Sequence, residues 1–246
     1  MLTIENIRKV NVYYYTIFAL IATAVSGLFL IGSSSQFIVP LLLIPSVTGV
    51  ADVILKRIRF GKWKYSPSAT ITGFILAMVL SPLPIYAQII VGIVAILQKH
   101  LIKRNNRHIF NPAAFGLLFA WVVFGSAPAW WAFITPAVFL FLFSDYLIGR
   151  LPLSLTFYTV SVGLVSVSSY FTTGIFSPTV LSYPLIFFAT VMVVEPRTSA
   201  MTKKGMIIEG ALLSLGVFAV QQFLPIDVFI PMLLLMNLLV HFKILK

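Results

Sequence analysis

The chain has 246 residues, of which 60% are hydrophobic and 9% are charged. Soluble globular proteins carry about 25% charged residues, so this chain lacks the polar exterior that a soluble domain needs. It has no cysteine, which excludes disulfides, thiol redox chemistry and cysteine-ligated iron–sulfur clusters within this polypeptide. The formal net charge of +11 fits a nucleic-acid-binding protein or a membrane protein with basic loops, and the positions of the charges distinguish the two.

The N-terminal residues 1–11 include Glu5, Arg8 and Lys9 and precede a long apolar run. No small-residue cleavage site follows a short apolar core, so we expect a cytoplasmic lead and not a removed signal peptide. Ten apolar runs then follow one another: 12–32, 37–55, 69–81, 85–97, 109–125, 130–148, 153–171, 181–194, 206–223 and 228–241. About 20 apolar residues span the hydrocarbon of a bilayer as a helix, so we predict an all-α polytopic membrane protein with about ten transmembrane helices.

The connections between these runs alternate in charge. Every second connection contains no Lys or Arg, namely 33–36, 82–84, 126–129, 172–177 and 224–227, and all 17 basic residues lie on the other side. Cytoplasmic loops are enriched in Lys and Arg, so we predict a multi-pass protein of the cytoplasmic (inner) membrane with both termini in the cytoplasm. Basic residues spread over six short segments beside apolar runs indicate contacts with lipid headgroups, and we expect no nucleic-acid partner.

The third and eighth runs, 69–81 and 181–194, are too short to cross a bilayer as straight helices, and each is followed by a proline. Short, proline-ended segments at matching positions of two halves are typical of broken helices around a central binding site. Because each half would contain five runs, an odd number, the second half enters the membrane from the opposite side. We therefore predict two inverted five-helix repeats, residues 1–126 and 127–246, within one membrane domain.

Three polar clusters lie at the ends of these runs. The first places Ser68, Thr70 and Thr72, with Gly73, at the start of the third run. These hydroxyls either bond the backbone and a neighbouring helix or line a ligand site.

The second cluster is Asn111-Pro112, at the start of the fifth run. Asn caps a helix well and Pro suits its first position, so the pair marks a helix start. It is either that alone or a helix N-terminus whose N–H groups face an anionic or polar ligand.

The third cluster is Glu195, at the end of the eighth run, followed by Thr198, Ser199 and Thr202. It is either a solvated loop or a site at the mouth of a cavity, because acids at membrane depth are candidates for function. By the charge pattern all three clusters lie on the cytoplasmic side, and we predict that they converge on one site.

The three histidines, His100, His108 and His241, lie at cytoplasmic ends of apolar runs, where we expect them to be solvated at the membrane interface. The sequence has no nucleotide-binding glycine loop and no histidine cluster with metal-ligand spacing. We therefore assign no catalytic residue and no metal ligand.

At its polar clusters the chain resembles the RnfD/NqrB family, whose members are membrane components of the Rnf electron-transport complex and of the Na+-translocating NADH:quinone reductase. Members of this family read roughly P-S-[ST]-x-x-x-T-G-x-x-L-A before the third span, N-x-F-N-P-A at the fifth and M-A-T-D-P-V-[TS]-[SA]-P after the eighth. Residues 67–77, 108–113 and 193–200 are similar to these motifs, and 235–237 match the L-M-N of the last span. The resemblance implies a membrane subunit of a flavin-dependent electron-transport system, with or without ion translocation, that works with other membrane subunits. An enzymatic role would be limited to electron transfer.

The chain also departs from this family. The covalent flavin attachment sequence S-G-A-T, in the external loop after the fifth span, has no counterpart in residues 125–130. We therefore expect any flavin, FMN or riboflavin, to bind non-covalently. Position 195 is Glu where the family has Asp, and Arg197 replaces a small apolar residue. Because the family's scaffold also looks like that of urea channels, the alternative is a transporter or channel for a flavin or another small polar solute.

Overall fold

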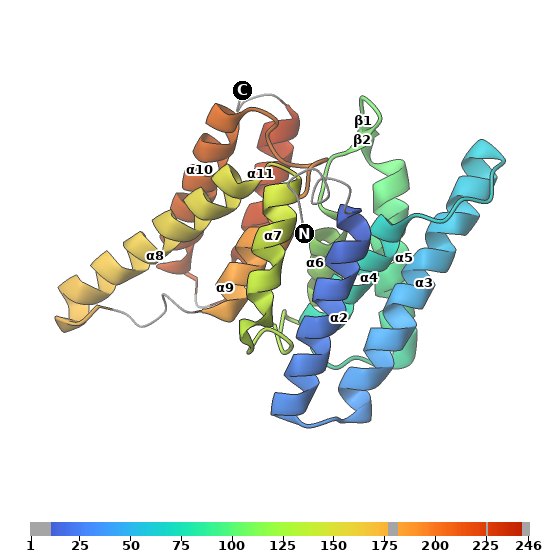
Figure 1. Cartoon of the computed structure of the whole chain (residues 1–246), viewed down its shortest axis with the longest axis horizontal. Helices are drawn as coiled ribbons and strands as arrows, with labels where there is room; N and C mark the ends of the chain where they lie inside the picture. Colours follow the sequence, from blue (N-terminus) through green and yellow to red (C-terminus); the bar gives the residue numbers. More distant parts are fainter. Residues whose placement is uncertain (1–10, 177–181, 225, 243–246) are drawn as a thin grey trace, which may run out of the picture.

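The computed structural model describes residues 11–176, 182–224 and 226–242, and these residues are mostly helical (Figure 1). In the described residues ten helical segments follow in order: α2 (Val12–Ile31), α3 (Ser35–Phe60), α4 (Pro67–Val79), α5 (Ile85–Leu101), α6 (Pro112–Phe124), η1 (Pro136–Phe139) continuing into α7 (Leu140–Leu147), α8 (Leu151–Thr173), α9 (Tyr183–Phe187) continuing into the π-helix η3 (Phe188–Met192), α10 (Lys203–Gln221) and α11 (Phe229–His241). Each segment coincides with one of the ten apolar runs, so the predicted helical fold is confirmed. The predicted lead 1–10 and residue 181, the expected start of the eighth run, lie outside the described residues.

Four of the helices in the described part of the chain, α2, α3, α8 and α10, are long and apolar enough to cross a membrane. The other six helical segments described have 10–17 residues. We predicted short segments only for the third and eighth runs, α4 and α9–η3, and the structure adds four more. Helix ends are set by capping groups and tertiary contacts, whereas an apolar run also includes residues in extended conformation.

The sixth run illustrates this difference. The run begins at Trp130, but the helix starts only at Pro136. In the segment before it, the Ala129 N–H donates to the Val79 carbonyl, at 2.7 Å, and the Trp131 indole N–H donates to the Ala77 carbonyl, at 2.9 Å. Two N–H groups of this segment are thus satisfied by carbonyls at the end of α4.

One short β-hairpin interrupts the helical architecture of the described residues. Strand β1 (Lys103–Arg104) pairs antiparallel with β2 (Arg107–His108) between α5 and α6. Its two turn residues, Asn105 and Asn106, both have positive φ angles, 51° and 61°, as two-residue hairpin turns require. The hairpin occupies only the basic loop between α5 and α6, and the mostly helical architecture of the described residues is compatible with the predicted all-α membrane protein.

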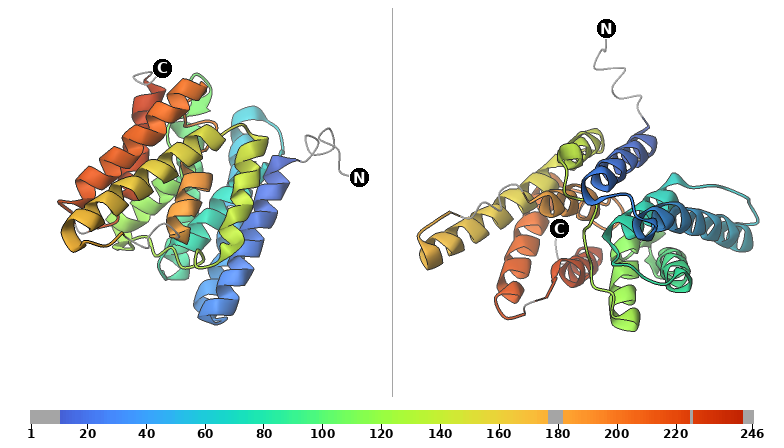
Figure 2. Two further views of the ribbon diagram at one scale, coloured as in Figure 1. Left: turned by 60° about the vertical axis from the view of Figure 1, so that its left-hand side comes forward. Right: turned by 90° about the horizontal axis from the view of Figure 1, so that it is seen from below.

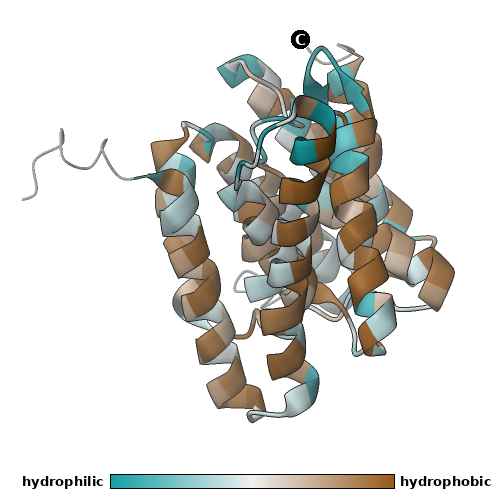
Figure 3. Cartoon of the chain, turned by 90° about the vertical axis from the view of Figure 1, so that its right-hand side faces the viewer, coloured by the Kyte–Doolittle hydropathy of each residue, from teal (hydrophilic) through white to brown (hydrophobic). Residues whose placement is uncertain are grey.

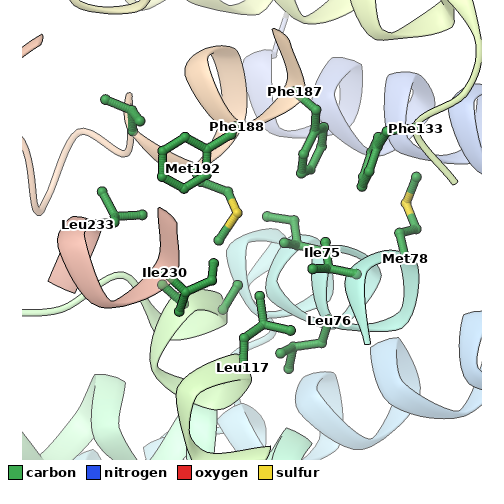
Figure 4. Packing of buried hydrophobic residues seen from close by; sticks show 14 of the residues in the cluster. Ile75, Leu76, Met78, Leu117, Phe133, Phe187, Phe188, Met192, Ile230 and Leu233 are labelled. Carbon is green, nitrogen blue, oxygen red and sulfur yellow. The ribbon is translucent and has the colours of Figure 1, made fainter. Parts of the chain in front are cut away.

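The hydrophobic core is built mainly from short segments at the centre of the molecule. Residues Ile75, Leu76, Met78 and Val79 of α4 are buried, and so are residues 186–189 around the α9–η3 junction. Figure 4 shows α4 side chains and η3 side chains meeting those of α6 and α11. Burial within protein rather than lipid explains how such short segments remain helical, because their free backbone ends find protein partners.

The long helices instead expose large apolar side chains to the surroundings. Phe29 of α2, Leu42 of α3 and Phe171 of α8 are 83%, 70% and 82% exposed. Exposed apolar surface of this extent along several helices is typical of contact with lipid tails. Figure 3 shows hydrophobic residues along the helices and hydrophilic residues gathered mainly at one end of the bundle.

The packing pairs recur in the two predicted halves. In the first half α2 packs on α4, α3 on α5, and α5 on α6. In the second half α7 packs on η3, α8 on α10, and α10 on α11, in the corresponding order. Contacts of α2 with η1 and α7, and of α6 with α11, join the halves. Seen from below, α3 and α8 extend to opposite sides of the centre (Figure 2).

Candidate functional site

Residues from all three polar clusters line one cavity of about 250 Å³. Ser68 and Thr72 contribute from α4, Asn111 and Pro112 from the start of α6, and Glu195 from the turn after η3. Residues of α2, α7, η3 and β2 also contribute to the lining. The cavity therefore lies where the two predicted halves meet, and it brings together these five residues of the three clusters.

Ser68 and Thr72 face the cavity because they are one turn apart on α4. The Thr72 hydroxyl donates to the Ser68 carbonyl at 3.0 Å, which leaves its oxygen able to accept. The Ser68 hydroxyl accepts from Lys99 Nζ at 2.8 Å and is 3.0 Å from the Ser66 hydroxyl. Both side chains can therefore offer hydroxyl groups to a ligand.

Thr70 and Gly73, from the same cluster, do not line the cavity. The Thr70 hydroxyl is 2.8 Å from the Tyr65 hydroxyl. Gly73 packs against α3, where a Cβ atom would come within 2.4 Å of Pro45 Cα. Gly73 therefore has a packing role: without a side chain at this position, α4 can approach α3 closely.

Asn111 caps α6 and also links α6 to η3 and α11 through hydrogen bonds. Its side-chain oxygen accepts from the Ala114 N–H at 3.1 Å, and its side-chain amide donates to the Met192 carbonyl at 3.0 Å. Its backbone N–H donates to Asn237 Oδ1 at 2.9 Å. The N–H groups of Asn111 and Ala114 are thus used within the protein, which supports the simpler interpretation of this cluster.

Glu195 is paired with a histidine at the edge of the cavity. Its Oε1 atom is 2.7 Å from His108 Nε2, and both residues line the cavity. The Thr198 hydroxyl is within 3.5 Å of Glu195 Oε2, and the Ser199 hydroxyl donates to the Glu195 carbonyl at 2.8 Å. Thr202 caps α10 by accepting from the Gly205 N–H. These three hydroxyls shape the turn after η3 and do not reach the cavity lining.

Two arginines hold this turn through its backbone carbonyls. Arg107 of β2 donates to the carbonyls of Pro196 and Arg197, at 2.6 and 3.1 Å. Arg150, which is buried before α8, donates to the Pro196 and Ala200 carbonyls and to the Ser199 hydroxyl. The turn that carries Glu195 is therefore fixed from both predicted halves.

The charge of Arg150 is balanced by Glu209 of α10. Burial lowers the pKa of the Arg150 guanidinium, and attraction to Glu209 partly offsets that shift. Glu209 is fully buried, and its Oε2 atom accepts from the Ala200 N–H at 2.7 Å. Both charged groups thus support the turn after η3.

A second charged network reaches the cavity through Ser68. Asp52 of α3 is fully buried, with Lys56 Nζ at 2.5 Å, His100 Nε2 at 2.8 Å and Lys99 Nζ at 4.0 Å. Since Lys99 also donates to Ser68, a continuous polar path joins the end of α3 to the cavity wall.

The expected solvation of the histidines is wrong for two of the three. His100 and His108 are 3% and 1% exposed, and Asp52 and Glu195 provide their hydrogen-bond partners. His241, at the end of α11, is partly exposed.

Among the cavity residues that were not identified from the sequence is one acid. Asp145 of α7 is fully buried and lines the cavity. An acid inside an apolar run is a signal of function, and it could have identified Asp145, which lies within the run 130–148. The same signal marks Asp52 and Glu209, which the structure places in supporting networks.

The cavity thus combines apolar walls with a small set of hydroxyl and carboxyl groups, as binding sites for small organic ligands do. The fold and the long apolar helices define a helical membrane protein. No protein-family model matches this chain, and no curated protein matches it in a sequence search.

Proposed function

We propose that this chain is a membrane component of a flavin-dependent electron-transport system, similar to the RnfD/NqrB family, and that the cavity holds a flavin non-covalently. One observation carries the proposal. The three motifs on which the resemblance rests are separated by 30 or more residues in the chain, yet Ser68, Thr72, Asn111 and Glu195 line one cavity. Unrelated capping motifs would have no reason to meet.

The cavity walls suit a planar, largely apolar ring with a polar edge. Ile71, Ile75 and Phe141 provide apolar surface, while Ser68 and Thr72 provide hydroxyls. Such a ring system is the reactive part of a flavin, and the protein's contribution is to bind it and to orient its polar edge. FMN or riboflavin would be held by these contacts alone, because the attachment sequence S-G-A-T is absent from residues 125–130.

The proposal includes ten membrane crossings in two inverted repeats, with both termini in the cytoplasm. It is supported by the recurring packing pairs and by the partition of the 17 basic residues. The cavity then opens toward the cytoplasm, and partner subunits of an electron-transport complex would exchange electrons with the flavin.

A second candidate is a transporter or channel for a small polar solute. The observation that favours it is the cavity volume of about 250 Å³, which is below the roughly 300 Å³ at which typical sites for drug-sized ligands begin. Its position between two half-length segments, α4 and α9–η3, is also that of a transport site.

A visible spectrum of the purified, detergent-solubilised protein separates the two candidates. The proposal predicts the absorption bands of oxidised flavin, release of that flavin on denaturation, and no flavin fluorescence in a denaturing gel. Thr72→Val should lose the flavin, whereas Thr23→Val should keep it. Thr23 is a matched control, because it is buried in α2, bonds the carbonyl four residues earlier as Thr72 does, and lies outside the cavity. A colourless protein that carries a small solute into vesicles would replace the proposal by the second candidate.

The topology is tested by single cysteines, since the chain has none of its own. We expect cysteines at Ser34, Ala127 and Thr173 to react with an impermeant reagent added outside the cell. Cysteines at Lys62, Arg104 and Lys203 should react only after the membrane is opened. Labelling of Lys62→Cys from outside would contradict ten crossings.

A further inference from the structure

Asp145 differs from the other buried acids of the described chain in having no hydrogen-bond partner for either carboxylate oxygen. Asp52 has Lys56 and His100, Glu195 has His108, and Glu209 has the Ala200 N–H. Each of these three acids is hydrogen-bonded to another group of the protein. Among the described residues no Lys, Arg or His lies within ion-pair distance of Asp145. The Ser154 hydroxyl lies near the Asp145 carboxyl group but donates to the Leu151 carbonyl, at 3.4 Å.

The surroundings of Asp145 add hydroxyl groups and one apolar wall. Thr16 of α2 and the adjacent Ser144 both line the cavity, with their hydroxyl oxygens 3.4 Å apart. Thr16 donates to the Val12 carbonyl, so its oxygen remains free to accept. Phe141, one helical turn before Asp145, is fully buried and also lines the cavity.

A carboxyl group accepts an N–H donor in either protonation state, and its neutral form also donates its O–H to an adjacent carbonyl. A fully buried carboxyl group without a partner loses its hydration and gains nothing in return, so a ligand that supplies the missing hydrogen bond recovers this free energy. An amide or imide edge, in which an N–H lies beside a C=O, matches both functions of the carboxyl group. A metal ion matches less well, because no three acidic or histidine residues gather in the described parts of the chain.

We propose that Asp145 accepts the N–H of an amide or imide edge of the bound ligand, and that this contact determines which heterocycles the cavity admits. The proposal rests on the proposed function and sharpens it. In a flavin this edge is the N3–H of the pyrimidine ring, which lies between two carbonyl groups. Asp145 is then a specificity-determining residue, and the Ser144 hydroxyl, which also lines the cavity, is placed to donate to an adjacent carbonyl.

The test compares riboflavin with its N3-methyl analogue, which lacks this N–H, by fluorescence titration of flavin-free protein. Wild-type protein should bind riboflavin at least about tenfold more tightly than the analogue, because the analogue leaves the Asp145 carboxyl group unpaired. Asp145→Leu should weaken riboflavin binding by about tenfold and bring the two ligands to similar affinity. Asp145→Asn retains an acceptor oxygen and should keep both the affinity and the preference.

Each other outcome counts against this proposal. Equal binding of the two ligands by wild-type protein would overturn the role of Asp145 while the proposed function stands. Loss of binding in Asp145→Asn to the same extent as in Asp145→Leu would mean that the negative charge is needed, and would overturn the hydrogen-bond role. Failure of wild-type protein to bind either flavin would overturn the proposed function, and this proposal with it.

Discussion

Two carboxylates line the same cavity, and their surroundings are opposite. Glu195 is held by His108, and its turn is fixed by Arg107 and Arg150 through backbone carbonyls. Asp145 is more deeply buried, yet neither of its oxygens has a partner among the described residues. The carboxylate of Glu195 is therefore hydrogen-bonded within the protein, whereas that of Asp145 is left unsatisfied.

The difference has an energetic meaning. A satisfied buried polar group stabilises the fold modestly, whereas an unsatisfied one costs about 1–3 kcal/mol. A buried polar group without a protein partner calls for an explanation, and the proposed ligand contact supplies one for Asp145. Substitutions around Glu195 should accordingly damage stability, while substitution of Asp145 should damage binding alone.

The largest effect is expected at Arg150. Arg150→Met removes a charged donor from two backbone carbonyls and from Ser199, and it leaves Glu209 without its nearby cation. We expect the free energy of unfolding in detergent to fall by about 3–5 kcal/mol, measured by denaturant titration. The double variant Arg150→Met/Glu209→Gln should lose less, because the buried charge is removed as well. If Arg150→Met were as stable as wild type, the turn after η3 would not depend on Arg150.

The next effect is expected at Asn111. Asn111→Leu breaks two buried side-chain hydrogen bonds, to the Ala114 N–H and to the Met192 carbonyl, whereas a helix cap alone is worth about 1 kcal/mol. We expect a loss of about 2–3 kcal/mol in unfolding free energy. Asn11→Leu, which removes an exposed cap at the start of α2, is the control and should cost less. Equal losses in the two variants would reduce Asn111 to a simple cap.

A smaller effect is expected at His108. His108→Phe keeps the ring and removes the hydrogen bond to Glu195, whose side chain is 22% exposed and so regains water. We expect the unfolding free energy to fall by about 1 kcal/mol. His241→Phe, at the end of α11, should leave stability unchanged in the same assay. A loss at His108 as large as that at Arg150 would mean that water does not reach Glu195.

The smallest effect on stability is expected at Asp145 itself. Asp145→Leu replaces an unsatisfied buried acid by an apolar side chain, so the unfolding free energy should stay the same or rise by up to about 1 kcal/mol. Thermal unfolding of ligand-free protein measures this directly. A clear loss of stability would show that Asp145 stabilises the fold, as Glu195 does, and would contradict the difference proposed between the two acids.

The positions of the helices could be predicted from the sequence because they depend on local composition. The ten apolar runs coincide with the ten helical segments described, and Asn111-Pro112 starts α6 as expected. The meeting of the three clusters could also be predicted, because the charge pattern places all of them at one end of the molecule. Clusters at the same end of the molecule come together if the two predicted halves face each other.

The tertiary structure decided which side chains of each cluster reach the cavity. Ser68 and Thr72 face it, whereas Gly73, only one residue further along α4, packs against α3. It also decided which acids are paired: Glu195 meets His108 across 87 positions of the chain, and Asp145 meets no such partner among the described residues. Local sequence determines whether a segment is helical and apolar, but hydrogen-bond partners far apart in the chain exist only once the helices have packed.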